Sequence, residues 1–261
     1  MAIERIVPGT IEWDSFYANH INRYLFARDV IIKHDANLVL DAACGVGYGS
    51  YFLSELPSRQ ITAIDRSKKA LNIAKSQFQR ENIFFLEDDC HTLMAASANG
   101  PYDAIVSFET LEHLPDPGAF ITACFNNLKQ GGQLIISTPN KLVSSPDGKL
   151  AWEYHEKEYS FEEFYSILSD HGFTGIQMFG QQFTGIGRLR ERVRNELFII
   201  HSNPFMRMGR LIQRLLRGHR VTALLPEQAE DFEIKQYDNA AQLNQLGKTG
   251  PFVLLAVCTK L

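Results

Sequence analysis

One stretch constrains the fold more than any other: residues 39–50 (VLDAACGVGYGS) place an acid, Asp41, after an apolar run and then carry three glycines at alternate positions. The apolar run, residues 38–40, predicts a buried parallel strand, and the pattern over 47–56 predicts a helix that opens at the strand's carboxyl end. Gly45 and Gly47 suit a tight turn with unusual dihedral angles, and they leave bare backbone that a ligand can approach. A glycine-rich loop without any ligand is the alternative interpretation.

A second acid marks the end of the next apolar run. Asp65 follows Ile61–Ile64, where a strand would hold a carboxylate against a ribose diol. The dinucleotide pattern G-x-G-x-x-G is incomplete, because Ser50 occupies its last position. The loop and the acid therefore favour a ribose-containing ligand, and a nicotinamide cofactor is less well supported.

From residue 37 onward, apolar runs of strand length alternate with helical patterns. Single helices between strands imply right-handed crossovers and a parallel sheet that is covered on both faces. We expect a polar loop over 141–158, followed by a helix that a capping-box pattern opens at Ser160. The expected strands are 37–42, 60–64, 83–86, 103–108, 133–137, 174–179 and 252–257, and the other expected helices are 13–32, 47–56, 67–79, 90–97 and 117–129.

Over about residues 35–180, the loop D-x-x-C-G-x-G-Y-G, the acid Asp65 and the later string ETLEH (109–113) resemble class I S-adenosylmethionine-dependent methyltransferases. The family usually has a glycine where this chain has Ala43. The resemblance implies an α/β fold with a Rossmann-like, seven-stranded, mostly parallel sheet and helices on both faces. Its last strand is expected antiparallel beside the fifth.

The same resemblance suggests three regions. They are an N-terminal arm and helix (1–35), a Rossmann-like methyltransferase domain (36–182 and 250–261), and an arginine-rich helical insertion before the last strand (183–249).

S-adenosyl-L-methionine is the cofactor that the resemblance implies. Asp65 would hold its ribose and Arg66 would lie on its adenine. Asp89 is the candidate to bind the adenine amine, and Asp88 is a nearly equal alternative. The complete set of predicted cofactor-binding residues is Arg23, Asp41, Gly45, Gly47, Asp65, Arg66, Asp89, Cys90 and Phe108.

In the resembled family, the helix before the first strand commonly lies over the cofactor. His20, Arg23 and Tyr24 are therefore candidates for the pocket wall, with Arg23 as the partner of the cofactor carboxylate. A helix that only covers the edge of the sheet is an equal alternative.

A compact string of possible metal ligands follows the fourth expected strand. Glu109 and Glu112 place two carboxylates on one side of a turn, and His113 adds an imidazole. Such ligands suit Mg²⁺, Mn²⁺ or a similar divalent ion. The string E-x-x-E-H occurs in ubiquinone-pathway O-methyltransferases and in small-RNA 2′-O-methyltransferases, and the RNA branch adds a downstream histidine to its metal site. By that resemblance His155 completes the metal ligands, and His113 and His155 are the candidate catalytic residues.

The chemistry favours an O-methyltransferase. A divalent ion lowers the pKa of a bound hydroxyl by several units, and a vicinal diol can chelate the ion. The expected acceptor is therefore a hydroxyl of a small molecule, a sugar or a glycan precursor. Two alternatives stay open: a metal-free N- or C-methyltransferase with His113 as base, and a non-catalytic cofactor-binding subunit.

The segment 188–220 holds nine arginines against two glutamates, a net charge of +7, which leaves −11 for the rest of the chain. It could form a lid or homodimer contact, receive an anionic acceptor, or dock peripherally on an acidic membrane. Nucleic-acid binding is not expected, because the remainder is strongly acidic. The chain start lacks an apolar run of signal-peptide length, so a cytoplasmic location is expected.

Overall fold

The computed structural model describes residues 7–150, 152–192 and 228–261. Its described residues fall into two compact units, one of residues 23–182 and 234–261, the other of residues 7–22 and 183–233 without the masked positions. Six of the nine arginines, from Arg194 to Arg220, lie outside the described residues, so the three interpretations of that segment stay predictions. No helix within the described ranges is long and apolar enough to cross a membrane.

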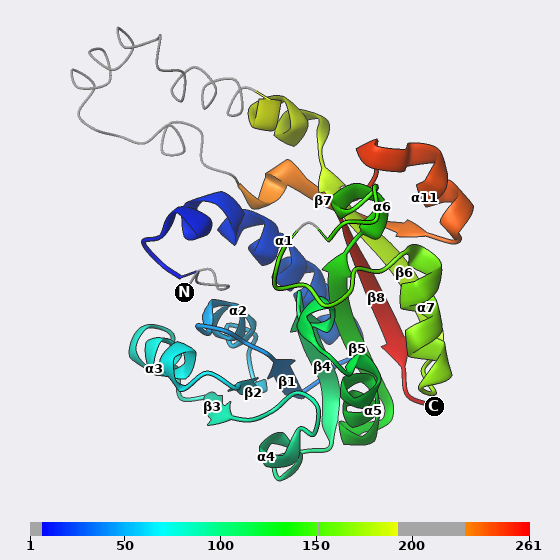
Figure 1. Ribbon diagram of the computed structural model, residues 1–261. Helices are drawn as coiled ribbons and strands as arrows, with labels where there is room; N and C mark the ends of the chain where they lie inside the picture. Colours follow the sequence, from blue (N-terminus) through cyan, green and yellow to red (C-terminus); the bar gives the residue numbers. More distant parts are fainter. Residues whose placement is uncertain (1–6, 151, 193–227) are drawn as a thin grey trace, which may run out of the picture. The chain divides into compact units, whose positions relative to one another are not determined.

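An eight-stranded sheet forms the centre of the fold (Figure 1), in the order β3-β2-β1-β4-β5-β8-β6-β7. The first five strands pair in parallel, and β8 lies antiparallel to both β5 and β6, as predicted for the last strand. The strands are β1 Leu38–Ala42, β2 Gln60–Asp65, β3 Ile83–Glu87, β4 Tyr102–Phe108, β5 Leu128–Pro139, β6 Thr174–Phe183, β7 Phe232–Tyr237 and β8 Val253–Thr259.

The predicted count of seven strands was wrong by one. The additional strand is β7, which lies in the range that the sequence assigned to a helical insertion. Its pattern FEIKQY buries only its first and last residues, Phe232 and Tyr237. Two consecutive exposed polar residues interrupt the alternation that would mark a strand.

Helices follow the strands much as predicted. The capping box at Ser160 is present: its Oγ accepts from the backbone N of Glu163 (3.2 Å), whose carboxylate accepts from the backbone N of Ser160 (2.8 Å). A short helix occupies 141–144 inside the expected polar loop, because the Asn140 side chain caps it. The helices are α1 Ile11–Lys33, α2 Tyr48–Leu53, α3 Lys68–Gln77, α4 Met94–Ser97, α5 Pro117–Asn127, α6 Lys141–Ser144, α7 Phe161–Asp170 and α11 Ala240–Leu246, with 3₁₀ turns η1 Leu111–His113, η3 Ala229–Asp231 and η4 Gly247–Thr249.

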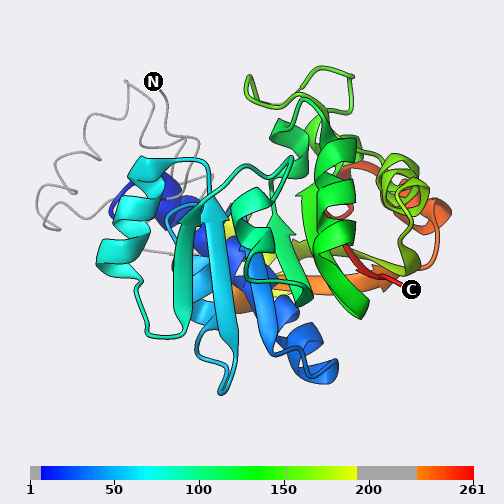
Figure 2. The same ribbon diagram turned by 90° about the horizontal axis from the view of Figure 1, so that it is seen from below.

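The sheet has an apolar core on each face, with helices on both sides of its strands (Figure 2). One core packs the sheet against α4, α5, α7 and α11, and the other packs it against α1, α2 and α3. Successive strand residues alternate between them: Leu134 and Ile136 belong to the first core, and Ile135 belongs to the second. Burial on both faces explains why the strands read as continuous apolar runs.

The strand register brings the polar strand ends to one edge of the sheet. Asp41 of β1 pairs with Ala63 of β2 and Val106 of β4, and Phe108 of β4 pairs with Ser137 of β5. The loops that carry the predicted site residues therefore leave the sheet at its carboxyl edge, where parallel α/β sheets bind their ligands.

Candidate functional site

The glycine loop combines one open position with one packed position. Gly45 has φ +58°, and a Cβ added there would meet no atom within 4 Å. Gly47 has φ +88°, and its added Cβ would lie 2.7 Å from the Cβ of Ala74. Gly45 thus offers bare backbone to a ligand, while Gly47 is required by the packing against α3. Ala43 also has a positive φ, 64°, a conformation that glycine adopts with less strain than alanine.

Asp65 stands at the end of β2, where the sequence placed it, and it is buried. Its Oδ2 accepts from the backbone N of Gly45 (3.1 Å) and its Oδ1 accepts from the backbone N of Ser67 (2.7 Å). Asp65 therefore links the glycine loop to the residue that caps α3 through hydrogen bonds. Its role toward a ribose stays a prediction, as does that of the neighbouring exposed Arg66.

Asp41 lies beneath the loop and is fully buried. It accepts hydrogen bonds from the Ser50 hydroxyl (2.5 Å) and the Tyr24 phenol (3.2 Å). Burial raises the pKa of Asp41 to about 6, and the charge of Asp65 adds to the rise, while the two hydroxyl groups oppose it. Asp41 connects the helices on either side of the loop, because its carboxylate accepts from Tyr24 of α1 and from Ser50 of α2.

Removing this carboxylate is expected to change the pH dependence of stability. Between the ordinary pKa of 3.8 and about 6, the folded protein binds more protons at Asp41 than the unfolded chain does. The stability contribution of Asp41 should therefore fall as the pH rises through this window, by about 3 kcal/mol. Urea unfolding of wild type and Asp41→Asn at several pH values measures the difference. If the difference in unfolding free energy between the two proteins were constant from below pH 4 to above pH 6, it would contradict this prediction.

The residues after β3 distinguish the two candidate aspartates. Asp88 accepts from the backbone N of Ala96 (2.8 Å), so it holds α4 in place. Asp89 is exposed, and its Oδ1 accepts from the backbone N of His91 (2.8 Å) and lies 2.7 Å from Nδ1 of that histidine. These hydrogen bonds hold the pKa of Asp89 below its ordinary value. Burial raises the pKa of the Cys90 thiol to about 12, which leaves a neutral side chain. Asp89 is thus the freer of the two to meet an adenine.

Arg23 is a fully buried charged side chain of the candidate site. The residue is 1% exposed, and its Nη1 donates to Oε1 of Gln181 at 2.6 Å. Its Nε and Nη2 find no hydrogen-bond partner among the described residues. An anionic group would satisfy both, so Arg23 fits the predicted partner of a cofactor carboxylate.

The other two predicted wall residues, His20 and Tyr24, belong to different units. Tyr24 binds Asp41, and Phe108 packs edge-to-face on its ring with centroids 5.0 Å apart. His20 belongs to the second compact unit and is described only there. The role of these residues as a wall over the cofactor stays a prediction.

Three of the four predicted metal ligands converge. Glu112, His113 and His155 each offer one ligand atom, and these atoms lie within 4.8 Å of one another. The Glu112 carboxylate is buried and accepts from the Thr138 hydroxyl (3.1 Å) at the end of β5. Nε2 of His113 lies 3.7 Å from Oε1 of Glu112.

Both histidines are oriented through the same ring nitrogen. Nδ1 of His113 lies 3.0 Å from the carbonyl oxygen of Tyr154, and Nδ1 of His155 lies 2.7 Å from Oε1 of Glu158. Because a carbonyl and a carboxylate only accept, each Nδ1 carries the proton. The remaining nitrogen of each ring, Nε2, is then the atom that can bind a cation.

Glu109 does not join this cluster. Its φ is +52°, and its Oε1 accepts from the Ser137 hydroxyl at 2.8 Å. Its carboxylate is thus hydrogen-bonded to β5. Burial raises the pKa of Glu112 well above its ordinary value, and the charge of Glu109 adds to the rise, so the two carboxylates remain near neighbours.

Several side chains of the site were not predicted. Gln181 accepts from Arg23, and Glu158 accepts from His155. The i, i+3 spacing of His155 and Glu158 is a signal that the sequence offers. No sequence signal marks Gln181, because its partner lies in α1.

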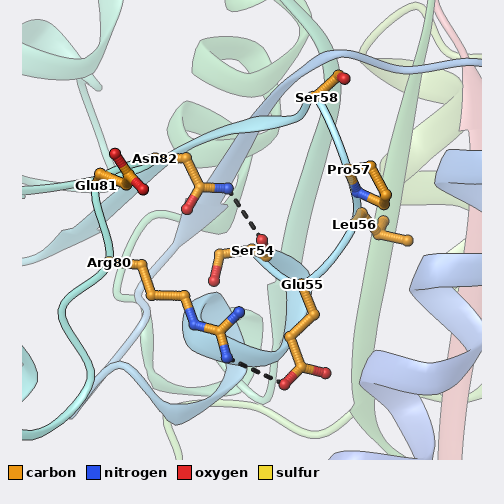
Figure 3. Close-up of a pocket in the computed structure, with 8 residues that line it drawn as sticks. All are labelled: Ser54, Glu55, Leu56, Pro57, Ser58, Arg80, Glu81 and Asn82. Carbon is orange, nitrogen blue, oxygen red and sulfur yellow. Dashed lines mark hydrogen bonds and ion pairs between the residues drawn. The ribbon is translucent and has the colours of Figure 1, made fainter.

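A separate pocket lies at the opposite edge of the sheet (Figure 3), in the loops that lead into the amino ends of β2 and β3. Two contacts hold it together: Arg80 Nη2 with Glu55 Oε1 at 3.2 Å, and Asn82 Nδ2 with the carbonyl of Ser54 at 2.9 Å. None of the predicted site residues lines it. It is distinct from the candidate site.

Two proteins with similar sequences are named as methyltransferases. The "Probable S-adenosylmethionine-dependent methyltransferase" of Mycobacterium tuberculosis strain H37Rv is 30% identical over 167 residues, which cover 61% of this chain and 59% of that protein. The chain thus spans less than two thirds of that relative. A ubiquinone biosynthesis O-methyltransferase of Xylella fastidiosa is 38% identical over 116 residues, 41% of this chain and 44% of that protein.

Solved structures share the fold at low identity. A Thermotoga maritima structure described as an S-adenosylmethionine-dependent methyltransferase and "possible histamine N-methyltransferase" has a TM-score of 0.58 at 14% identity, covering 96% of this chain and 95% of that one. The methyltransferase domain of a bacterial Hen1 has a TM-score of 0.57 at 19% identity, covering 93% of this chain and 98% of that one. These likenesses support the Rossmann-like α/β fold.

A family model described as "Methyltransferase domain" matches residues 15–178, which is more than half of the chain. The match includes the glycine loop, Asp65 and the cluster of Glu112, His113 and His155. The chain belongs to this methyltransferase family and, with the glycine loop and acid described above, to the class I S-adenosylmethionine-dependent methyltransferases.

Proposed function

We propose that this methyltransferase acts on a hydroxyl group, which a divalent ion held by Glu112, His113 and His155 activates. The observation that carries the proposal is the convergence of these three ligand atoms within 4.8 Å from two separate segments of the chain. The orientation of both histidines through Nδ1 supports it, because metal-binding histidines usually donate their other ring N–H to an oxygen.

The cofactor would be held by the residues of the carboxyl edge. Arg23 would pair its Nε and Nη2, which lack a partner among the described residues, with the carboxylate, and Gly45 would present open backbone. Asp65 and Asp89 would hold the ribose and the adenine amine. Bound S-adenosylmethionine supplies an electrophilic methyl group, so these residues contribute mainly alignment.

The ligand set refines the choice of metal. With Glu109 outside the cluster, the site offers one carboxylate and two imidazoles, which is less rich in oxygen than the sequence implied. Imidazole ligands favour transition metals, whereas Mg²⁺ prefers carboxylates and water. We therefore propose Mn²⁺, Co²⁺ or Zn²⁺ ahead of Mg²⁺.

The proposed acceptor is a vicinal diol of a catechol-like molecule or a sugar. Two adjacent oxygens can chelate a cation that is held by only three protein ligands. The similarity to a ubiquinone biosynthesis O-methyltransferase, which covers 41% of this chain, supports O-methylation. Such a protein site also leaves open positions for the acceptor.

A methyl-transfer assay tests this function. Purified protein is given S-adenosylmethionine with a catechol, a sugar diol or a primary amine, each with and without excess chelator. We expect transfer to a diol that chelator abolishes and Mn²⁺ restores, with S-adenosylhomocysteine affinity unchanged. Full activity in chelator would reject the metal and leave His113 as the candidate base, and methylation of the amine alone would reject O-methylation.

A further inference from the structure

Glu158 is a buried carboxylate beside His155, one of the three proposed metal ligands. Its side chain is fully buried, and that of its partner His155 is 8% exposed. Oε1 of Glu158 accepts from Nδ1 of His155 at 2.7 Å, and Oε2 accepts from the Ser144 hydroxyl at 2.5 Å. A carboxylate so placed can set the direction of the imidazole ring.

The partner of Glu158 on its other side is itself anchored to the sheet. Ser144 ends α6, whose first turn is capped by Oδ1 of Asn140, which accepts from the backbone N of Leu142 at 3.1 Å. Nδ2 of Asn140 donates to the carbonyl of Pro251 at 2.7 Å. Since Asn140 directly follows β5, these contacts fix the position of the Ser144 hydroxyl relative to the carboxyl end of β5.

The backbone of the histidine loop is attached separately. The carbonyl of Glu112 accepts from the backbone N of Glu156 (2.7 Å) and of Lys157 (3.3 Å). The backbone N of Lys141 donates to the carbonyl of Tyr159 at 3.0 Å. These contacts place the loop beside η1, but they do not choose the rotation of the His155 ring.

We infer that Glu158 is the positioning residue of the proposed metal site: it accepts Nδ1–H of His155 and thereby directs Nε2 toward Glu112 and His113. The inference rests on the proposed function, because it assumes that a cation binds there. An accepting carboxylate fixes the tautomer and orientation of a ligating histidine and raises its basicity, and its removal typically costs about 10- to 100-fold in metal affinity.

Titration of the whole protein with Co²⁺ tests the inference, with calorimetry for affinity and the visible absorption of Co²⁺ for its coordination. Glu158→Ala should weaken Co²⁺ binding by about 10- to 100-fold and change the absorption, while S-adenosylhomocysteine affinity stays unchanged. Glu158→Gln keeps an oxygen that accepts from His155, so it should restore most of the affinity. Glu156→Gln is the matched control, because the Glu156 side chain is exposed, and it should bind Co²⁺ like wild type.

The outcomes separate the inference from the function on which it rests. Wild-type protein that binds no Co²⁺ would overturn both. Wild-type binding that Glu158→Ala leaves unaltered would overturn the inference alone. If Glu158→Ala fails to fold, Ser144→Ala still removes one of the side-chain groups that donate to the carboxylate. It should weaken binding less than tenfold but measurably, and unaltered affinity and absorption in Ser144→Ala would then overturn the inference.

Discussion

Arg23→Met is expected to weaken the binding of S-adenosylhomocysteine by about 2–4 kcal/mol, or roughly 30- to 1,000-fold. The guanidinium is 1% exposed, and its Nε and Nη2 have no partner in the described part of the chain. A ligand carboxylate placed against them would be desolvated, so loss of the cation would leave that anion buried without a partner. Isothermal titration calorimetry measures the change.

Two controls make this result specific. Arg28→Met applies the same substitution to the same helix, but the Arg28 side chain is 28% exposed and stacks over Phe52, so the affinity should stay close to that of wild type. Methylthioadenosine lacks the amino-acid part of the cofactor, so Arg23→Met should bind it like wild type. Equal affinity of Arg23→Met and wild type for S-adenosylhomocysteine would remove Arg23 from the cofactor site.

Glu112→Gln is expected to reduce methyl transfer on the order of a thousandfold, with little change in cofactor affinity. The amide can keep the hydrogen bond from the Thr138 hydroxyl, which measures 3.1 Å in wild type, so packing should survive. The substitution removes the only carboxylate of the three-residue cluster, so the cation should bind poorly. The acceptor hydroxyl then attacks slowly, because without the cation its pKa lies far above neutrality. Turnover with the diol identified in the assay measures the effect.

Glu109→Gln provides the contrast for this prediction. The side chain of Glu109 lies outside the cluster and accepts from Ser137 at 2.8 Å, so its loss should reduce turnover much less than the loss of Glu112. If Glu112→Gln kept full activity, neither a metal nor this carboxylate would take part in the reaction. If Glu109→Gln were the more damaging variant, the ion would need to be placed between Glu109 and Glu112.

Local chemistry explains what could be predicted from the sequence. An apolar run followed by Gly45 and Gly47 determines a strand and a tight turn, because only the neighbouring residues need to agree. The strand that ends at Asp65 and the capping box at Ser160 are of the same kind. Even the antiparallel last strand followed from the family pattern. Each of these features depends on residues within about one turn or one strand of each other, or on a motif order that relatives share.

The remainder depended on contacts between residues far apart in the chain. Arg23 meets Gln181 across 158 positions, and no local pattern selects that glutamine. Glu109 and Glu112 stand in one short string, yet the carboxylate of Glu109 binds Ser137, and Glu112 is the one that joins the two histidines. The sequence alone determined which ligand types this edge of the sheet carries. The tertiary structure decided which of them converge, because side-chain direction depends on backbone angles and buried partners that lie on other strands.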